Sequence, residues 1–494
     1  MNMPAGGTGF LRKAEALSRL RGALPEASVL HEPEDTRPYE CDGLTAYRAL
    51  PGIVALPENE RQVQQVLRIC SELGLPVVAR GAGTGLSGGA LPSPAGVLLS
   101  LAKMKRILAV DPVARTARVQ PGVRNLAISE AAAPYGLYYA PDPSSQIACS
   151  IGGNVAENAG GVHCLKYGLT VHNVLRLRAI TVDGEIVEFG SEALDAPGYD
   201  LLALVTGSEG MLAVTTEITV KLVPKPESAR VILAAFDDVE KAGAAVASVI
   251  TAGIIPAGLE MMDRPATRAV EEYVHAGYDL AAAALLLCES DGTPEEVEEE
   301  IARMTEVLRG AGAYDFRVSR NEAERLKFWS GRKAAFATMG RISPDYYCMD
   351  GTIPRKRLAE ILRFIALLEK KYALRCPNVF HAGDGNLHPL ILFDANDPDQ
   401  LRRTESFAGE VLEKCIEVGG TITGEHGVGI EKINQMCLQF SPEELELFRA
   451  VKRAFDSRGL LNPGKNIPTL HRCAEFGRMH VRGGNLAFPG LERF

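Results

Sequence analysis

A run of five glycines in eleven residues constrains the fold of this chain more than any other feature. Residues 80–90 read RGAGTGLSGGA and contain the G-x-G-x-x-G pattern of dinucleotide-binding loops. In the common nicotinamide-type fold a helix follows this loop, and its N-terminus faces the pyrophosphate. Here Pro92 and Pro94 follow, and proline breaks a helix interior. The sequence therefore predicts strand, glycine loop, strand, with the loop amides forming an anion nest; a tight β-connection without ligand is the alternative.

Two further clusters of small residues lie in the same half of the chain. Residues 142–161 read DPSSQIACSIGGNVAENAGG, and residues 206–210 read TGSEG. Few large side chains and many backbone donors are typical of a backbone that closely lines an extended ligand. As structure alone, residues 142–161 would form an unusually long loop. Three such clusters together predict a site for a long dinucleotide.

Composition excludes several classes of protein. The chain has 494 residues and a net charge of −9, without the basic stripe that nucleic-acid binding requires. No run reaches the ~18 apolar residues that span a bilayer, and no apolar signal segment opens the sequence. The ten cysteines never form C-x-x-C, so neither a zinc ribbon nor a local iron–sulfur motif is encoded. We therefore expect a cytoplasmic chain.

The pattern of elements changes near residue 225 and predicts two α+β domains. The expected division is an N-terminal segment 1–51, a first domain 52–224, a second domain 225–430 and a C-terminal segment 431–494. Strands of the first domain are expected at 52–56, 76–80, 97–101, 107–110, 117–120, 178–182, 185–189 and 211–222, with a helix at 58–73. After residue 225, a strand is expected at 231–236 and helices at 237–252, 293–310, 321–339, 355–371, 397–418 and 442–458.

A pair of histidines flanks an expected β-turn. Residues 378–393 read NVFHAGDGNLHPLILF, in which Asp384-Gly385 is typical of a two-residue hairpin turn. With those two as the loop, His381 pairs directly with His388. Directly opposed residues lie on one face with Cβ atoms ~5 Å apart, which lets two imidazoles share one metal ion.

A third ligand is expected from residues 419–432, which read GGTITGEHGVGIEK. In an extended segment successive side chains face opposite sides, so one of Glu425 and His426 faces the metal and the other faces something else. Two histidines and one glutamate with open positions are typical of a catalytic metal site. The alternatives are that each histidine is an ordinary turn or core residue, or that the set belongs to a zinc hydrolase that uses no dinucleotide.

The expected helix at 321–339 offers a group for binding a carboxylate. Trp329, Arg332 and Phe336 recur at helical spacing and share a face. Arginine suits bidentate binding of a carboxylate. The alternative is a surface arginine whose stem packs on Trp329.

The three small-residue clusters resemble the flavin-binding domain of the vanillyl-alcohol oxidase / p-cresol methylhydroxylase superfamily. The resemblance covers residues 35–494 and implies an α+β fold, with a two-subdomain FAD-binding domain, a cap domain with an antiparallel sheet, and a C-terminal segment that returns to the FAD domain. It implies FAD as cofactor, without showing a covalent bond. The implied cofactor-binding residues are Arg80, Gly81, Ala82, Gly83, Thr84, Gly85, Leu86, Ser87, Gly88, Gly89, Pro141, Asp142, Ser145, Gly152, Gly153, Asn154, Asn158, Gly160, Gly161, His163, Gly207, Glu209, Gly210 and Asn462.

The segments HAGDGNLHP and TGEHGVG resemble the D-2-hydroxy-acid dehydrogenase branch of that superfamily. The resemblance implies that His381, His388 and Glu425 bind a divalent cation (zinc, manganese or iron), that His426 is the base at the flavin, and that Arg332 holds the substrate carboxylate. Relatives acting on dicarboxylic acids carry a basic residue where this chain has Cys348-Met349-Asp350. We therefore expect a small 2-hydroxy acid, glycolate first and D-lactate second.

The resemblance also implies partners. A related FAD-type subunit and an iron–sulfur subunit would pass electrons towards membrane quinone, with at most peripheral membrane association of this chain. The C-terminal residues 470–494 are a candidate docking segment or a tail without such a role. Two alternatives stay open: a D-lactate or other D-2-hydroxy-acid dehydrogenase that acts alone, and a non-catalytic flavin-binding subunit.

Overall fold

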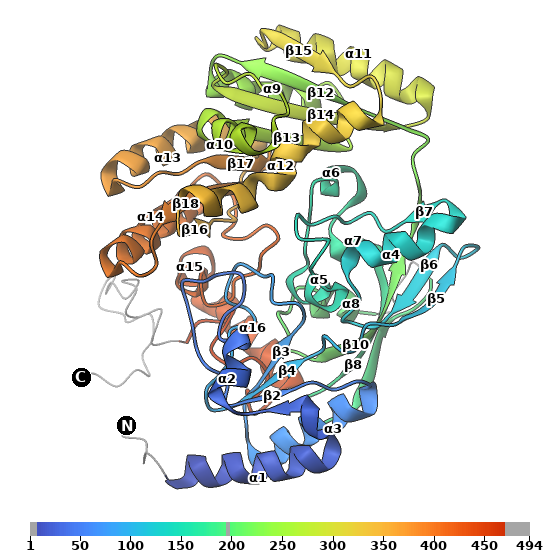
Figure 1. Cartoon of the computed structure of the whole chain (residues 1–494), viewed down its shortest axis with the longest axis vertical. Helices are drawn as coiled ribbons and strands as arrows, with labels where there is room; N and C mark the ends of the chain where they lie inside the picture. Colours follow the sequence, from blue (N-terminus) through green and yellow to red (C-terminus); the bar gives the residue numbers. More distant parts are fainter. Residues whose placement is uncertain (1–6, 194–197, 470–494) are drawn as a thin grey trace.

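The structure, a computed structural model, describes residues 7–193 and 198–469. Residues up to about 224 form the lower part of the molecule in Figure 1, and the green-to-orange residues that follow form the upper part. The red C-terminal helices return to the lower part (Figure 1). The two parts meet along one side, and the functional residues gather there.

A four-stranded sheet carries the glycine loop at its edge. Its order is β1 (Val29–Leu30), β2 (Ile53–Ala55), β4 (Val97–Ser100) and β3 (Val77–Arg80). Strands β2 and β3 run parallel to β4, and the glycine loop joins β3 to β4, so the expectation of strand, loop, strand is confirmed. Helix α3 (Glu60–Leu73) buries Val63, Val66 and Leu67, which recur at helical spacing, in a core shared with α1 (Gly7–Ala23).

The second sheet of the lower part is antiparallel. Its order is β5 (Ile107–Asp111), β6 (Thr116–Val119), β10 (Val214–Lys221), β8 (Val174–Ile180) and β9 (Ile186–Gly190). The hairpin expected around Asp183-Gly184 is confirmed, because Ile180 pairs with Ile186 across it. The other elements of this part are α2 (Pro33–Thr36), α4 (Asn125–Ala132), β7 (Leu137–Tyr138), α6 (Cys164–Tyr167), α7 (Thr170–Asn173), α8 (Leu201–Val205) and β11 (Val223–Pro224).

Residues 142–161 differ from the expected long loop. They contain helix α5 (Ile151–Glu157), whose N-cap Ser150 accepts from the Gly153 amide at 3.4 Å. The helix ends at Asn158, which adopts a left-handed φ of 53°. A Cβ on Gly152 would lie 2.6 Å from Pro121, so this glycine permits close packing of the helix. Capping residues and close packing together stabilise a helix that the glycine-rich composition did not indicate.

The upper part is a seven-stranded antiparallel sheet. Its order is β15 (Asp315–Val318), β12 (Ser228–Phe236), β14 (Ala284–Gly292), β13 (Gly258–Asp263), β17 (Asn378–His381), β18 (Asn386–Phe393) and β16 (Asp345–Cys348). Strand β12 alternates between two cores, with Ile232 and Phe236 on one face and Val231 and Leu233 on the other. The cap therefore has the α+β architecture with an antiparallel sheet that the resemblance implied.

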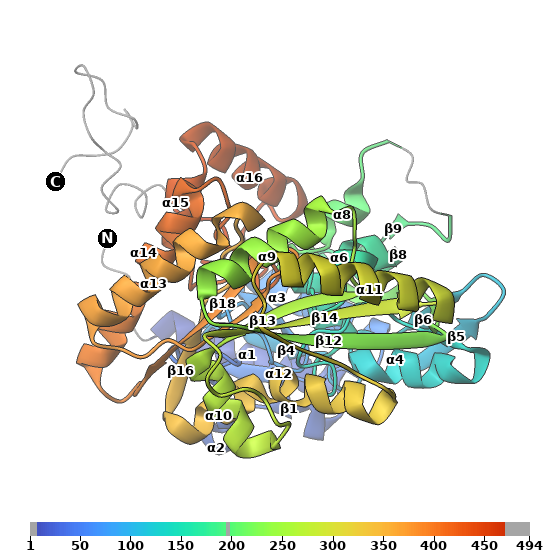
Figure 2. The same cartoon turned by 90° about the horizontal axis from the view of Figure 1, so that it is seen from above.

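Helices cover both faces of the cap sheet. Residues of α9 (Val239–Thr251), α11 (Pro294–Gly310), α13 (Leu358–Tyr372) and α14 (Pro398–Glu417) join the first core, and those of α10 (Arg264–Val274) and α12 (Glu322–Ile342) join the second. Seen from above, α9 and α11 lie over β12 and β14 (Figure 2). The expected cap helices are thus confirmed, with ends shifted by a few residues.

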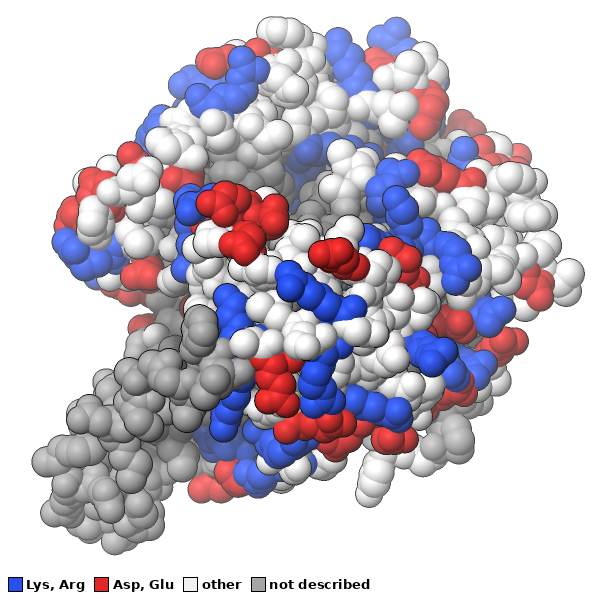
Figure 3. All heavy atoms as spheres, turned by 60° about the horizontal axis from the view of Figure 1, so that its bottom comes forward, with Lys and Arg blue, Asp and Glu red and all other residues white. Residues whose placement is uncertain are grey.

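The C-terminal residues lie against the first sheet. Helices α15 (Ile433–Gln439) and α16 (Pro442–Phe455) precede a segment in which the Asn462 amide donates to the Val77 carbonyl at 2.7 Å. The exact domain boundaries stay predictions. No helix within residues 7–193 and 198–469 is long and apolar enough to span a bilayer. On the face shown in Figure 3, basic and acidic residues are intermixed.

Candidate active site

A cavity of about 440 Å³ lies where the two parts of the chain meet. One wall comes from the glycine loop and from residues 143–159. The opposite wall comes from α12, β16 and β18, and residues 425 and 426 close it. The cavity therefore places the glycine clusters opposite the cap residues that carry the expected chemistry.

Many of the expected cofactor residues line this cavity or a smaller one of about 70 Å³ beside it. The larger cavity is lined by Gly81, Ala82, Gly83, Thr84, Gly85, Leu86, Ser145, Gly153 and Asn154. The smaller one is lined by Arg80, Gly89, Gly152, Glu209 and Gly210. Outside both lie Ser87, Gly88, Pro141, Asp142, Asn158, Gly160, Gly161, His163, Gly207 and Asn462, whose contact with a cofactor stays a prediction.

The glycine loop fits an anionic group. Among the described residues, no backbone amide from Gly81 to Ser87 donates a hydrogen bond to another part of the chain. Gly83 has a left-handed φ of 73°, and a Cβ there would lie 2.1 Å from the Arg80 guanidinium. Successive unused amides beside a cavity are the donors that an anion nest requires. The loop therefore fits the pyrophosphate of FAD.

Two loop-supporting residues were expected as cofactor ligands. The Asn462 amide side chain donates to the carbonyls of Glu209 at 2.6 Å and Gly89 at 3.1 Å. The Glu209 carboxylate accepts from the amides of Val428 at 2.7 Å and Gly429 at 2.8 Å. In this structure Asn462 joins the glycine loop to Glu209, and Glu209 in turn binds residues 428–429. A direct role of either residue in binding FAD stays a prediction.

The expected pairing of His381 with His388 is wrong. His381 pairs with Asn386, and His388 pairs with Val379, because four residues rather than two form the turn. The register therefore differs by two residues. Since side chains alternate with a period of two, the shift keeps both histidines on one face as diagonal neighbours. Their ring centroids lie 4.9 Å apart, so the conclusion that they can share an ion survives the error in register.

Glu425 lies between the two histidines. Its Oε1 is 3.1 Å from His381 Nε2 and 3.2 Å from His388 Nε2. Both histidines are buried, and neither ring nitrogen of His388 has a hydrogen-bond partner among the described residues. A buried imidazole that makes no hydrogen bond and lies beside a carboxylate forms with it a suitable pair of ligands for a cation. The three expected metal ligands are therefore brought together.

Glu260 on β13 is a site residue that the sequence analysis missed. Its Oε1 lies 2.7 Å from His381 Nδ1, and its Oε2 accepts from Arg332 Nε at 2.7 Å. Burial alone would lower the pKa of His381, but the carboxylates of Glu260 and Glu425 raise it well above its usual range. A carboxylate that holds the other nitrogen of a histidine ligand is typical of metal sites. Its signal in the sequence was a single acidic residue inside the apolar strand GLEMMD.

Arg332 lies on α12 and is 1% exposed, so the surface alternative is wrong. Its Nη1 and Nη2 have no hydrogen-bond partner among the described residues, whereas its Nε is held by Glu260. Phe336, one helical turn further on, lines the cavity. Arg332 itself is not among the residues that line the cavity, but a buried guanidinium with free donors one helical turn from a lining residue is suited to an anionic ligand.

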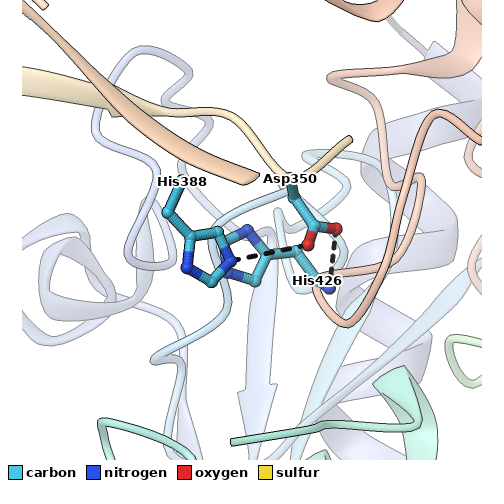
Figure 4. A group of neighbouring side chains, drawn as sticks. All are labelled: Asp350, His388 and His426. Carbon is cyan, nitrogen blue, oxygen red and sulfur yellow. Dashed lines mark hydrogen bonds and ion pairs between the residues drawn. The ribbon is translucent and has the colours of Figure 1, made fainter. Parts of the chain in front are cut away.

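His426 faces the same cavity as Glu425, whereas the sequence analysis expected the two side chains to face opposite sides. The segment around them is not a strand, so alternation does not apply. The His426 ring stacks on His388 at a centroid distance of 4.9 Å and an angle of 7° (Figure 4). Burial, together with His388 and Lys432, lowers the pKa of His426 to about 4. The imidazole is therefore neutral near pH 7 and able to accept a proton.

His163, expected near the flavin, lies in a polar junction between the two parts of the chain, and its proximity to FAD stays a prediction. Its Nδ1 is 2.8 Å from Asp142 Oδ2, and its Nε2 is 3.2 Å from Glu289 Oε1 on β14. Arg325 on α12 donates to the same Glu289 carboxylate at 2.8 and 2.9 Å. Burial alone would lower the pKa of His163, but Asp142 and Glu289 raise it to about 10.

This junction makes stability depend on pH. The pKa of His163 rises from 6.5 in the unfolded chain to about 10 in the folded one, so its contribution is complete below pH 6.5 and lost as the pH rises towards 10. We expect the Tm of the wild type to fall over this range more than that of His163→Gln. Thermal unfolding at stepped pH measures the difference, with His172→Gln as control. Parallel curves for wild type and His163→Gln would contradict the expectation.

Two family models match the chain. A model described as "FAD binding domain" matches residues 51–190, and one described as "FAD linked oxidases, C-terminal domain" matches residues 225–466. The first covers the glycine loop, and the second covers the histidine pair, Glu425 and His426. Together with the site, these matches define an FAD-linked oxidoreductase.

Curated relatives are similar over nearly the whole chain. The chain is 64% identical to the glycolate oxidase subunit GlcD of Escherichia coli, over 98% of this chain and 97% of the relative. It is 40% identical to the protein of that name in Bacillus subtilis (86% and 91% covered) and 32% identical to D-lactate dehydrogenase of Anaerostipes hadrus (91% and 97% covered). The chain belongs to the GlcD family of FAD-linked oxidoreductases.

Solved structures confirm the fold class. The fold matches p-cresol methylhydroxylase with a TM-score of 0.79 at 17% identity, covering 95% of this chain and 98% of that one. It matches 4-ethylphenol oxidase from Gulosibacter chungangensis with a TM-score of 0.77 at 17% identity, covering 95% and 99%. Three segments, residues 37–51, 341–354 and 472–481, also resemble the D subunit of bacterial glycolate oxidase, in agreement with the curated GlcD relatives. The third of these segments lies outside the described residues.

Proposed function

We propose that this chain oxidises glycolate to glyoxylate, with FAD as the hydride acceptor. The observation that carries the proposal is that His388, Glu425 and His426 line the same cavity as the glycine loop. Oxidation of a 2-hydroxy acid needs a base for the hydroxyl proton, a positively charged side chain that binds the carboxylate and an acceptor for the hydride. Groups suited to the first two tasks lie around this cavity, and the names of the GlcD relatives support glycolate as substrate.

We propose that His381, His388 and Glu425 hold a divalent cation. The separations of 3.1 and 3.2 Å between the glutamate oxygen and the two imidazole nitrogens are close to the roughly 3.3 Å between ligands of a tetrahedral zinc ion. The hydrogen bond between the Glu260 carboxylate and His381 Nδ1 also supports the proposal. Such a cation would lower the pKa of the substrate hydroxyl.

His426 is the proposed base. Its ring is neutral near pH 7, and its Nδ1 has no hydrogen-bond partner among the described residues. Glycolate loses two electrons and two hydrogens when it becomes glyoxylate. His426 would accept the hydroxyl proton, and FAD bound along the glycine loop would supply the acceptor for the carbon-bound hydrogen as hydride.

Arg332 is the proposed partner of the substrate carboxylate. We expect Arg332→Lys to raise KM for glycolate about tenfold or more, because lysine cannot reproduce the planar fork and a charge-assisted hydrogen bond is worth about 1.5–3 kcal/mol. Steady-state kinetics with a dye acceptor measure the effect. Arg325→Lys, on the same helix but paired with Glu289, should leave KM unchanged. An unaltered KM in Arg332→Lys would leave this arginine with a structural role only.

We further propose that the reduced flavin passes electrons to partner subunits, a related FAD-type subunit and an iron–sulfur subunit. The GlcD relatives are named as subunits, and the sequence has no C-x-x-C motif of its own. The cytoplasmic location and peripheral membrane association stay predictions.

A substrate panel tests the proposed function. Purified, FAD-loaded protein is assayed with glycolate, D-lactate, L-lactate and D-2-hydroxyglutarate and an artificial electron acceptor. We expect the highest kcat/KM for glycolate. A clear preference for D-lactate would support the D-lactate dehydrogenase alternative, whose name one relative carries. No turnover of any of the four would support the non-catalytic alternative.

A further inference from the structure

We propose that Asp350 is a positioning residue that holds Glu425 and His426 in place by binding the backbone of residues 423–426. The inference rests on the proposed function, because it concerns the groups assigned there as metal ligand and base. Asp350 follows β16 and is fully buried. The sequence analysis considered it only as part of Cys348-Met349-Asp350, in relation to substrate size.

Donors from one loop converge on the Asp350 carboxylate. The amides of Gly424, Glu425 and His426 donate to it at 3.0, 3.1 and 2.9 Å, and the Thr423 hydroxyl donates at 2.5 Å. Three successive amides on one anion form the same kind of nest that binds free anions. Both the proposed ligand and the proposed base are therefore anchored through their own backbone.

No strand pairing supports the loop at this point, although the Ser87 hydroxyl donates to the His426 carbonyl at 2.9 Å and the Ile422 amide donates to Gln439 Oε1 at 3.0 Å. Its last backbone pairing with the cap is the bridge between Thr421 and Thr352, and residues 422–427 belong to no strand. The amides that a strand would satisfy in a ladder are satisfied by Asp350 instead. A Cβ on Gly424 would lie 1.6 Å from Asn386 Nδ2, so the loop lies closely against the hairpin that carries the histidines.

Asp350 is itself held in place. Asn386 Nδ2 donates to its Oδ1 at 2.9 Å, and Lys432 Nζ lies 3.2 Å from its Oδ2. Lys432 is as fully buried as Asp350, and it also donates to the Gly427 carbonyl at 2.8 Å. Asp350 thus binds the loop at residues 423–426, and Lys432 binds it at the Gly427 carbonyl. The carboxylate charge is compensated by the lysine and by the amide dipoles, which is how a buried charge is tolerated.

Asp350 also lies close enough to His388 and His426 to form an alternative group of metal ligands (Figure 4). The hydrogen bonds argue against that role. A carboxylate offers about four lone-pair sites, and these are already used by the four loop donors, Asn386 and Lys432. By contrast, one oxygen of Glu425, Oε1, lies 3.1 and 3.2 Å from the two histidines, whereas Asp350 Oδ1 lies 3.7 Å from His388 Nε2. The geometry thus assigns Glu425 to the cation and Asp350 to the loop.

The test compares Asp350→Asn with wild type in the full-length, FAD-loaded protein. Asparagine keeps the shape but turns an NH₂ group towards loop donors, so the loop should shift. We expect metal affinity, measured by competition with a chelator, to weaken about 10–100-fold, and kcat for glycolate to fall by a similar factor, while FAD content is unchanged. Thr423→Val removes one donor only and should show the same changes several-fold smaller.

Asp345→Asn is the matched control. Asp345 lies on β16, the strand that precedes Asp350, and accepts from the Thr45 hydroxyl at 2.7 Å and the Ala395 amide at 2.9 Å, away from the loop. Replacing the Asp345 carboxylate with an amide should lower Tm without changing metal affinity or kcat. Wild-type metal affinity or kcat in a folded Asp350→Asn would overturn the inference. Absence of glycolate turnover in the wild type would overturn the proposed function instead, because the comparison of metal affinity needs no substrate.

Discussion

Replacing His426 with alanine is expected to lower kcat for glycolate by about 100-fold or more, because it removes the group that accepts the hydroxyl proton. The ring is neutral near pH 7 since burial lowers its pKa to about 4, and it stacks on His388 at the wall of the cavity. FAD content should not change, because the loop amides that fit the pyrophosphate lie in residues 81–87. Single-turnover flavin reduction isolates this step from later electron transfer.

The result has a clear control. His172 is exposed and lies outside the cavity, so His172→Ala should turn over like wild type. A kcat within a few-fold of wild type in His426→Ala would remove this residue from the chemistry. A loss of FAD in the variant would indicate a structural role for the ring instead.

The second large effect is expected on removal of the proposed cation. Chelation should abolish glycolate-dependent dye reduction while FAD stays bound, and added zinc, manganese or iron should restore it. His388→Ala should lose at least about 100-fold in metal affinity, since a change in a partner of a ligand alone costs 10–100-fold. Its activity should not return with added cation. Metal analysis and dye reduction on the same samples measure both effects.

Full activity after chelation, with metal analysis showing no bound cation, would contradict the metal assignment. His381, His388 and Glu425 would then form a hydrogen-bonded cluster, and Glu260 would hold His381 for structural reasons. Such a result would leave the proposed base and the glycine loop untouched.

Patterns within short stretches of sequence predicted the parts of the site that depend on residues close together in the chain. Pro92 and Pro94 were enough to separate this glycine loop from one followed by a helix. The histidine hairpin was placed on the correct face although its register was wrong by two residues, because an even shift preserves the face of a strand. Helix α5 was missed because glycines lower helix propensity, whereas its caps and its packing on Pro121 stabilise it.

The contacts that complete the site join residues far apart in the sequence. Glu260 reaches His381 across 121 positions and Arg332 across 72, and Asp350 reaches His426 across 76. The order of strands β13, β17, β18 and β16 in the cap sheet places Glu260 near His381, whereas Arg332 reaches Glu260 from α12 and His426 reaches Asp350 from a segment outside the strands. Strand order follows from packing of the whole sheet, so no local pattern could indicate these partners.

Anaerobic titration of the FAD-loaded protein with glycolate tests the central claim most directly, with the flavin absorbance as the readout. The account predicts that glycolate bleaches the flavin in protein that holds its cation. The flavin should bleach far more slowly in chelated protein, and also far more slowly in His426→Ala. Flavin that stays oxidised in the metal-loaded wild type, with glycolate and with the other 2-hydroxy acids, would contradict the account.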